Sequence, residues 1–171
     1  MKALFLKSIA TLLFRSIFLF PAGCTKPDNR LFSIEKNDLY GYADARGDTV
    51  VGCQYTLCFT DTITRIGFVA DQHGRISCLD NQGKFLFFVF AYDNGPDNPS
   101  EGLFRIIGQD GRMGYADTLG HIVIEPRYKF AHPFVNGRAK VADRGSVVIE
   151  GSPNGDRHET WVSDKWYHIS R

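Results

Sequence analysis

Three cysteines and one histidine come closest to the ligand pattern of a metal site. Cys53 and Cys58 are separated by four residues. His73 and Cys78 repeat this spacing twenty residues further on. Paired thiolate and imidazole ligands hold structural zinc, but cysteines in an oxidising compartment also form disulfides, and free cysteines pack well as small apolar residues. Which of these applies depends on where the fold places the four side chains.

Other groups of reactive side chains are weaker candidates. His158 and Glu159 begin like the zinc-binding H-E-x-x-H helix, but residue 162 is Val and Pro153-Asn154-Gly155 disfavours a helix just upstream. Three aspartates, Asp44, Asp80 and Asp117, recur and could suggest calcium, yet no dense acidic loop accompanies them. No ordered set of nucleophile, base and acid stands out. The sequence therefore predicts no catalytic residue.

The recurring aspartates belong to an internal repeat. They lie 36 and 37 residues apart, as do Gly47, Gly83 and Gly120. Residues 31–44 (LFSIEKNDLYGYAD) match residues 103–117 (LFRIIGQDGRMGYAD) across two such periods. Repeats of this length are typical of stacked or radial arrays in which each unit buries its apolar face against its neighbours.

The repeat has the composition of strands and hairpins. Short runs of aromatic and β-branched residues alternate with Gly, Asp and Asn, and no helical stripe competes. In one unit we expect strands over residues 112–116, 121–125 and 138–142, so the fold is predicted to be all-β with three antiparallel strands per unit. The recurring Gly47, Gly83 and Gly120 are expected in tight turns, where only glycine readily adopts positive φ.

The repeat alignment bears on the cysteines. Cys53 lies over Pro126, Cys58 over Ala131, and Cys78 over both Tyr42 and Tyr115. Two of these cysteines thus replace residues that are expected to pack. We predict no metal and no cofactor, and we leave a disulfide among the three as an open alternative.

The unit resembles the WG repeat of bacterial proteins, whose pattern is roughly K-W-G-Y-I-D-x-x-G-x-x-V-I-P-x-x-Y. Residues 112–128 match this pattern best, and residues 39–44 match it next. Residues 75–80 keep little beyond the aspartate, and at residues 166–167 Tyr replaces the glycine. The resemblance implies a scaffold of repeats without shared catalytic residues.

The predicted organisation follows the period, with a repeat domain at 30–171. Its parts are a partial unit at 30–38, repeats at 39–71, 72–108 and 109–143, an insertion at 144–164 and a partial repeat at 165–171. We expect an open array, with a small propeller-like closure of the two ends as the alternative. Insertions in repeat arrays often lie on the binding face, so the insertion is a candidate site, although neutral change in a surface loop explains it equally well.

One strand candidate is apolar on both faces. Residues 85–90 read FLFFVF, and alternation sends every second side chain to the same side. If a neighbour does not cover one side, Phe85, Phe87 and Val89, or their alternates, form an apolar patch for a partner. The alternative is a central strand buried on both faces.

The first residues indicate export. Residues 1–23 contain three basic and no acidic residues around an apolar run too short to span a bilayer, as in a signal peptide. They end in Pro21-Ala22-Gly23-Cys24, which resembles the lipobox of bacterial lipoproteins and implies a lipid on Cys24, followed by a short linker at 24–29. An ordinary secretory signal, cleaved nearby, is the alternative. The remaining chain has no basic run, so nucleic acid is not an expected partner.

These patterns predict a non-enzymatic binding or scaffold module at the cell envelope, lipid-anchored to a membrane. Its partner would be an unknown protein or an envelope polymer. The alternative is a small hydrolase or carbohydrate-active enzyme with its site near residues 145–164, which would require carboxylates or a catalytic triad converging in a pocket there.

The anchor can be tested by replacing its acceptor. Cys24→Ala removes the thiol that would carry the lipid, so the variant should leave the membrane fraction, and incorporation of labelled palmitate should fall to background. A variant that stays in the membrane fraction, together with a wild type that takes up no label, would show that Cys24 is not lipidated.

Overall fold

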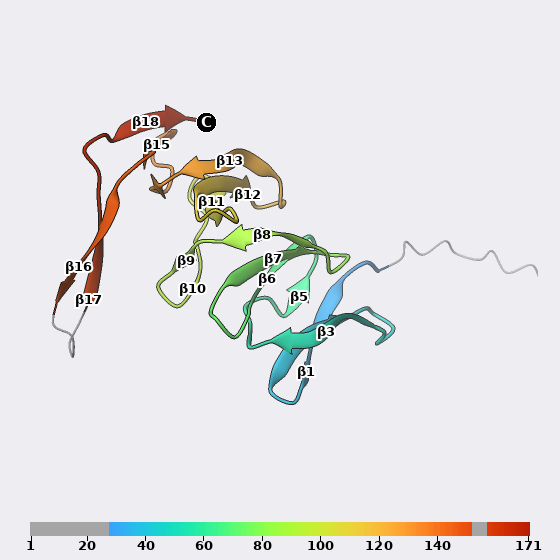
Figure 1. The fold of residues 1–171 in the computed structure, drawn as a ribbon. Helices are drawn as coiled ribbons and strands as arrows, with labels where there is room; N and C mark the ends of the chain where they lie inside the picture. Colours follow the sequence, from blue (N-terminus) through green and yellow to red (C-terminus); the bar gives the residue numbers. More distant parts are fainter. Residues whose placement is uncertain (1–27, 152–156) are drawn as a thin grey trace, which may run out of the picture.

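The computed structural model describes residues 28–151 and 157–171, and all of its regular elements are β-strands. The strands form several antiparallel sheets that follow one another along an elongated molecule, and none closes into a barrel (Figure 1). The protein is therefore the open β-repeat array that the sequence predicts.

The first sheet has the order β3-β2-β1-β5. Its strands are β1 (Leu31–Lys36), β2 (Leu39–Ala43), β3 (Thr49–Tyr55) and the short β5 (Thr62–Ile63). β1 pairs with β2 on one side and with β5 on the other, so it is not the open edge that a lone initial strand would be. The β4 strand (Leu57–Cys58), which lies between these elements in sequence, pairs instead with the next sheet.

The second sheet combines strands of three repeats and has the order β13-β12-β11-β8-β7-β6-β4. Its longer strands are β6 (Ile66–Ala70), β7 (Ile76–Asp80), β8 (Phe85–Val89), β11 (Leu103–Ile107), β12 (Met113–Asp117) and β13 (Ile122–Tyr128). A small hairpin of β9 (Ala91–Tyr92) and β10 (Gly95–Pro96) projects between β8 and β11.

The last repeat sheet has the order β14-β15-β18, formed by β14 (Phe130–Ala131), β15 (Arg138–Ala142) and β18 (Tyr167–Ser170). Between β15 and β18, β16 (Ser146–Gly151) and β17 (Arg157–Val162) form a separate two-stranded hairpin. The alternative, a small propeller-like closure of the two ends, is not what the described strands form, because β1 and β18 lie at opposite ends of the array (Figure 1).

Each repeat contributes three strands, but its third strand pairs with the first strand of the next repeat. The pairs that cross a repeat boundary are β1 with β2, β6 with β7, β11 with β12, and β15 with β18. Every main sheet therefore combines strands of at least two successive repeats, and none is completed by one repeat alone.

The recurring Asp-x-x-Gly segments form tight turns between strands. Gly47, Gly83 and Gly120 have φ of 88°, 76° and 92°, which confirms the predicted positive-φ turns. In each turn the glycine N–H donates to the aspartate carbonyl, and the aspartate carboxylate accepts further backbone N–H groups. Asp117, for example, accepts from Leu119 and from His121, both at 2.9 Å. Backbone geometry thus explains the recurring aspartates without calcium.

The electrostatics of these turns fit the hydrogen bonding. Desolvation alone would raise the pKa of the Asp117 carboxyl, but the His121 N–H, its imidazole and the Leu119 N–H outweigh this and lower it. Asp44 and Asp71 behave in the same way, because backbone N–H groups and a neighbouring arginine favour their ionised forms. The carboxylates serve as acceptors that close the turns.

A close backbone approach explains the glycine in the Gly-Tyr-Ala-Asp segments. A Cβ on Gly114 would lie 2.6 Å from the nitrogen of Pro126 and closer still to the carbonyl oxygen of Ile124. Gly41 meets the equivalent atoms of β3 in the same way. Both glycines lie where the register shifts in a β-bulge. At the equivalent position of the middle repeat, Ser77 faces Phe88 in regular register and needs no glycine.

The bulge also lengthens the strand that follows. β13 runs to Tyr128, where the sequence indicated an end at residue 125, because the shifted register lets Met113 pair with Tyr128. Pro126 within β13 has no N–H to donate, which an edge strand tolerates. The predicted strand over residues 138–142 matches β15.

The same core position is occupied by tyrosine in two repeats and by cysteine in the middle one. Tyr42 and Tyr115 are fully buried, and each hydroxyl donates at 2.7 Å to a carbonyl of the returning loop, that of Thr60 and of His132 respectively. Burial raises the pKa of both phenols. The middle repeat has Cys78 instead, facing Phe87, whereas Tyr42 faces Val51 and Tyr115 faces Ile124. The middle repeat thus has a small residue, Cys78, where the other repeats have tyrosine, and the larger Phe87 on the facing strand compensates for the lost volume.

The close approach at Gly114 yields a stability prediction. Gly114→Ala places a methyl group against the backbone of β13 and should lower the free energy of unfolding by about 1–3 kcal/mol, as overpacking does. The matched control is Gly52→Ala, because a Cβ at Gly52 meets nothing within 4 Å. Urea denaturation of both variants measures the difference, and equal stabilities would rule out the close approach as the reason for glycine.

Candidate functional site

The β16–β17 hairpin is the clearest departure from the repeat and stands apart from the repeat sheets (Figure 1). It occupies the insertion at 144–164, and its turn lies outside the described residues. Its exposed large apolar residues are Val147, Val148, Ile149 and Val162, which we call the hairpin patch. Successive residues of β16 point to opposite faces, so the patch has members on both sides of the ribbon.

Aromatic stacking fixes the base of the hairpin. The Trp161 indole stacks on the Phe130 ring with centroids 5.1 Å apart and planes 13° from parallel. It also meets Phe90 and His132 edge-on or tilted, both at 5.6 Å. Since these three residues come from the repeat body, the base of the ribbon is held while its length projects.

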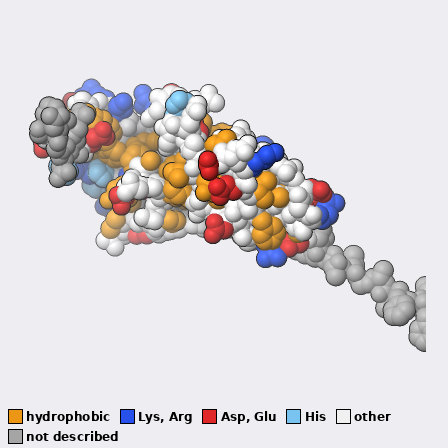
Figure 2. Space-filling view, turned by 90° about the horizontal axis from the view of Figure 1, so that it is seen from below, with side chains coloured by type: hydrophobic (Ala, Val, Ile, Leu, Met, Phe, Trp, Pro, Cys, Tyr) orange, Lys and Arg blue, Asp and Glu red, His pale blue; other side chains and the backbone are white. Residues whose placement is uncertain are grey.

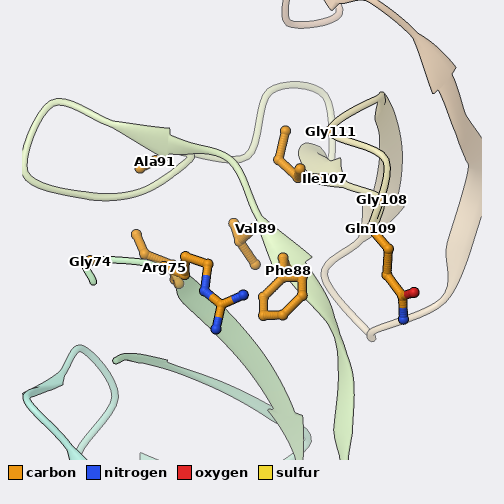
Figure 3. A pocket seen from close by; sticks show the side chains of 10 residues that line it. Gly74, Arg75, Phe88, Val89, Ala91, Ile107, Gly108, Gln109 and Gly111 are labelled. Carbon is orange, nitrogen blue, oxygen red and sulfur yellow. The ribbon is translucent and has the colours of Figure 1, made fainter. Parts of the chain in front are cut away.

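Seen from below, apolar side chains lie between charged ones over much of the body (Figure 2). One groove of about 350 Å³ lies between the turns at Gly74 and Gly111 (Figure 3). Phe88, Val89 and Ile107 contribute its apolar wall. The Arg75 guanidinium lies 5.0 Å from the Phe88 ring centroid, and its Nη2 pairs with the Asp71 carboxylate at 2.9 Å.

The groove lacks groups for acid–base or nucleophilic chemistry. Of the described residues that line it, Arg75 alone carries a charge, and that charge is paired with Asp71. Its glycine-rich rim and apolar wall are suited to contact with an apolar side chain rather than to catalysis.

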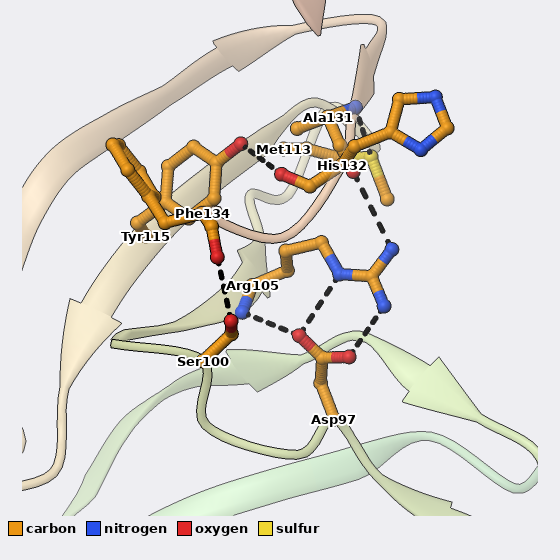
Figure 4. Close-up of polar contacts among 8 residues, drawn as sticks. All are labelled: Asp97, Ser100, Arg105, Met113, Tyr115, Ala131, His132 and Phe134. Carbon is orange, nitrogen blue, oxygen red and sulfur yellow. Dashed lines mark hydrogen bonds and ion pairs between the residues drawn. The ribbon is translucent and has the colours of Figure 1, made fainter. Parts of the chain in front are cut away.

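A buried ion pair lies beside the base of the hairpin (Figure 4). Arg105 and Asp97 are 4% and 5% exposed, and their guanidinium and carboxylate form a two-pronged pair. The Arg105 N–H also donates to Asp97 at 2.8 Å, and the guanidinium lies 4.2 Å from the Phe90 ring centroid. Residues 92–100, between β8 and β11, therefore form a loop that supplies a counter-charge to the interior.

The neighbouring contacts tie this loop to the following repeat. Ser100 donates its hydroxyl to the Phe134 carbonyl at 2.6 Å, and Arg105 reaches the Ala131 carbonyl at 3.4 Å (Figure 4). The pair was not identified from the sequence. The available signal was an arginine inside the otherwise apolar strand LFRII, together with an aspartate in the preceding loop.

The apolar patch expected at Phe85, Phe87 and Val89 is wrong for two of the three residues. Phe85 is 43% exposed, but Phe87 and Val89 are 7% and 4% exposed and belong to the core. The reason is that β8 is an inner strand, paired with both β7 and β11, and one of its faces packs on Phe104 and its neighbours.

The three described cysteines are free, and none pairs in a disulfide. Cys78 is fully buried, and desolvation, with a smaller effect of Asp80, raises its pKa to about 12. The Cys58 thiol lies 3.3 Å from the Tyr42 hydroxyl. Among the described residues no three His, Cys, Asp or Glu side chains are grouped as a metal site would require. Cys78 thus packs in the core, as its alignment with Tyr42 and Tyr115 in the repeat indicates.

The carboxylates beside the insertion do not converge. Asp143 accepts a hydrogen bond from the Tyr167 hydroxyl at 2.7 Å, and Asp164 pairs with Arg144. Desolvation and the bond to Asp143 raise the pKa of Tyr167 to about 12. Each of these two carboxylates thus has a side-chain partner of its own. Cys24 and the predicted signal peptide lie outside the described residues, and within the described ones no helix could cross a membrane.

Fold and surfaces together define an all-β repeat protein with one inserted hairpin. Comparison with protein families identifies a WG containing repeat at residues 113–145, from β12 to just past β15. The chain thus contains a WG repeat, at the unit whose residues resemble the pattern best. No curated protein and no solved structure matches the chain.

The buried ion pair predicts a strong effect of removing one partner. Asp97→Ala leaves the Arg105 guanidinium buried without its counter-charge, so the free energy of unfolding should fall by about 3–5 kcal/mol. The double variant Asp97→Ala with Arg105→Met removes both charges and should cost less than Asp97→Ala alone. Urea denaturation measures both, and a double variant less stable than the single one would contradict the argument.

Proposed function

We propose that the protein is a non-enzymatic binding or scaffold module at the cell envelope, lipid-anchored through Cys24, which holds a protein partner through its inserted hairpin. The observation that carries this proposal is the hairpin patch. An isolated two-stranded ribbon cannot bury its own apolar residues, and it is at best marginally stable in water.

The apolar content of the hairpin supports contact with a partner. A surface ribbon needs β-formers, but Thr supplies this propensity without an apolar surface. β16 has Val147, Val148 and Ile149 in succession, exposed by 44%, 39% and 50%. Exposed apolar side chains gathered on both faces of one projecting element are more than singly scattered surface residues, and they favour contact with a partner.

The architecture supports a scaffold role. The aromatic base at Trp161 holds the hairpin in a defined place, which lowers the entropy lost on binding. The two strands also have outer edges, which β16 and β17 do not share with any other described strand. A partner strand added there would gain backbone hydrogen bonds while its side chains meet the patch.

The test removes the apolar surface while keeping strand propensity. Val148→Thr with Ile149→Thr should abolish retention of envelope proteins by the immobilised chain, whereas the wild type retains a defined partner. The control is Ile122→Thr with Val123→Thr on β13. Both of these residues are 40% exposed, and their replacement makes the same chemical change away from the hairpin. Equal retention by the two double variants would exclude the hairpin as the binding surface.

A further inference from the structure

A concave surface on the last repeat sheet gathers basic side chains. It has a volume of about 310 Å³ and lies over β15 and β18. Arg138 and Lys140 alternate along β15 with the buried Ala139 and Val141, so both point outward. His168 faces Lys140 directly across the strand pair, and Asn136 completes this part of the rim.

None of these basic side chains has an ion-pair partner among the described residues. Among the described residues, no carboxylate lines the concavity. The Glu101 carboxylate lies beside it, where it accepts the N–H of Gly137, between Asn136 and Arg138, at 3.0 Å. The Lys140 ammonium lies 4.7 Å from the centroid of the Trp166 ring.

The strand registers identify the same positions in the preceding sheet. Lys140 faces His168 as Arg105 faces Tyr115, and Arg138 faces Ser170 as Leu103 faces Asp117. Lys140 and Arg105 thus occupy equivalent positions, and so do Arg138 and Leu103. Where the preceding sheet has the buried Leu103 and Tyr115, the last sheet has Arg138 and His168.

The equivalence with Arg105 shows what a cation at this position can bind. Arg105 holds the carboxylate of Asp97, which the 92–100 loop places against it. A second concavity, beside Arg105 and Asp97, adjoins the one at Lys140, and His132 and Pro133 line both. Lys140 nevertheless has no carboxylate placed against it as Arg105 has. The last sheet therefore has the cation without the anion that the preceding sheet supplies internally.

The need for a polar outer face at the end of the array explains only in part why this sheet has unpaired basic side chains. Terminal repeats need a polar outer face, but mixed charges serve solubility as well and avoid repulsion. Outward side chains two residues apart on a strand, such as Arg138 and Lys140, lie on the same face and repel when both are charged. A bound anion would relieve that repulsion.

We propose that this concavity binds an oxyanion, a phosphate or sulfate group, with Arg138 and Lys140 as the charged donors and Asn136 and His168 as neighbouring polar groups. Arg138 offers a planar fork suited to two oxygens, and Lys140 a point charge. Its volume has room for the anion and part of the molecule that carries it. The site is separate from the hairpin patch and does not depend on the function proposed for it.

The experiment titrates the full chain with inorganic phosphate, with sulfate and with linear polyphosphate, and follows the His168 ring and the Trp166 indole by NMR. Saturable shifts at both residues are expected. Arg138→Gln with Lys140→Gln should weaken phosphate binding by at least about tenfold, because two charge-assisted contacts are lost. Both side chains are exposed, so thermal unfolding should remain that of the wild type.

The control is Lys36→Gln with Lys84→Gln, which removes the same charge on the first two sheets. Binding weakened equally by both double variants, or a wild type without saturable shifts, would overturn the proposal. Polyphosphate that binds more tightly per phosphate than inorganic phosphate would identify a polymer as the source of the group. Equal affinity per phosphate would identify a free or terminal anion.

Discussion

Backbone pairing across repeat boundaries holds this molecule together. The third strand of one repeat completes the sheet of the next, as β6 does for β7 and β11 does for β12. A single repeat would leave one edge of that strand unpaired, because β6 and β11 pair within their own repeats only with β4 and β8. Stability is therefore a property of neighbouring repeats, and a substitution at a boundary strand affects two of them. The array also stays open for this reason, since each new strand extends the row and none of the described strands returns from β18 to β1.

Within this arrangement, the side chains can vary as long as the volume between strands is kept. The middle repeat, which resembles the family pattern least, has the same strands as its neighbours. Cys78 opposite Phe87 fills the space that Tyr115 opposite Ile124 fills in the next repeat. The backbone requirements are stricter. Gly114 is needed where β13 bulges toward β12, whereas Ser77 is accepted because β8 does not bulge at that point.

Local rules explain what could be predicted from the sequence. Gly47, Gly83 and Gly120 were found because a tight turn imposes its conformation within four residues, and Tyr42 and Tyr115 because repetition marks the core. Phe87 and Val89 could not be placed, since alternation shows which side chains share a face but not whether a neighbouring strand covers it. The ion pair of Arg105 with Asp97 could not be predicted for the same reason. Its burial depends on how a loop folds over a strand eight residues away.

The departures from the repeat gather in one region. The 92–100 loop packs against residues of the last sheet, Trp161 joins the inserted hairpin to Phe90 and Phe130, and the basic concavity shares His132 with the loop. Repeats that only extend an array have no need for such additions, because each costs conformational entropy that regular strands do not. The first sheet, by contrast, follows the pattern with short turns alone. The end with β1 to β3 is thus the regular part of the array, and the two surfaces proposed for binding both lie near the other end, where the hairpin, the ion pair and the unpaired cations adjoin.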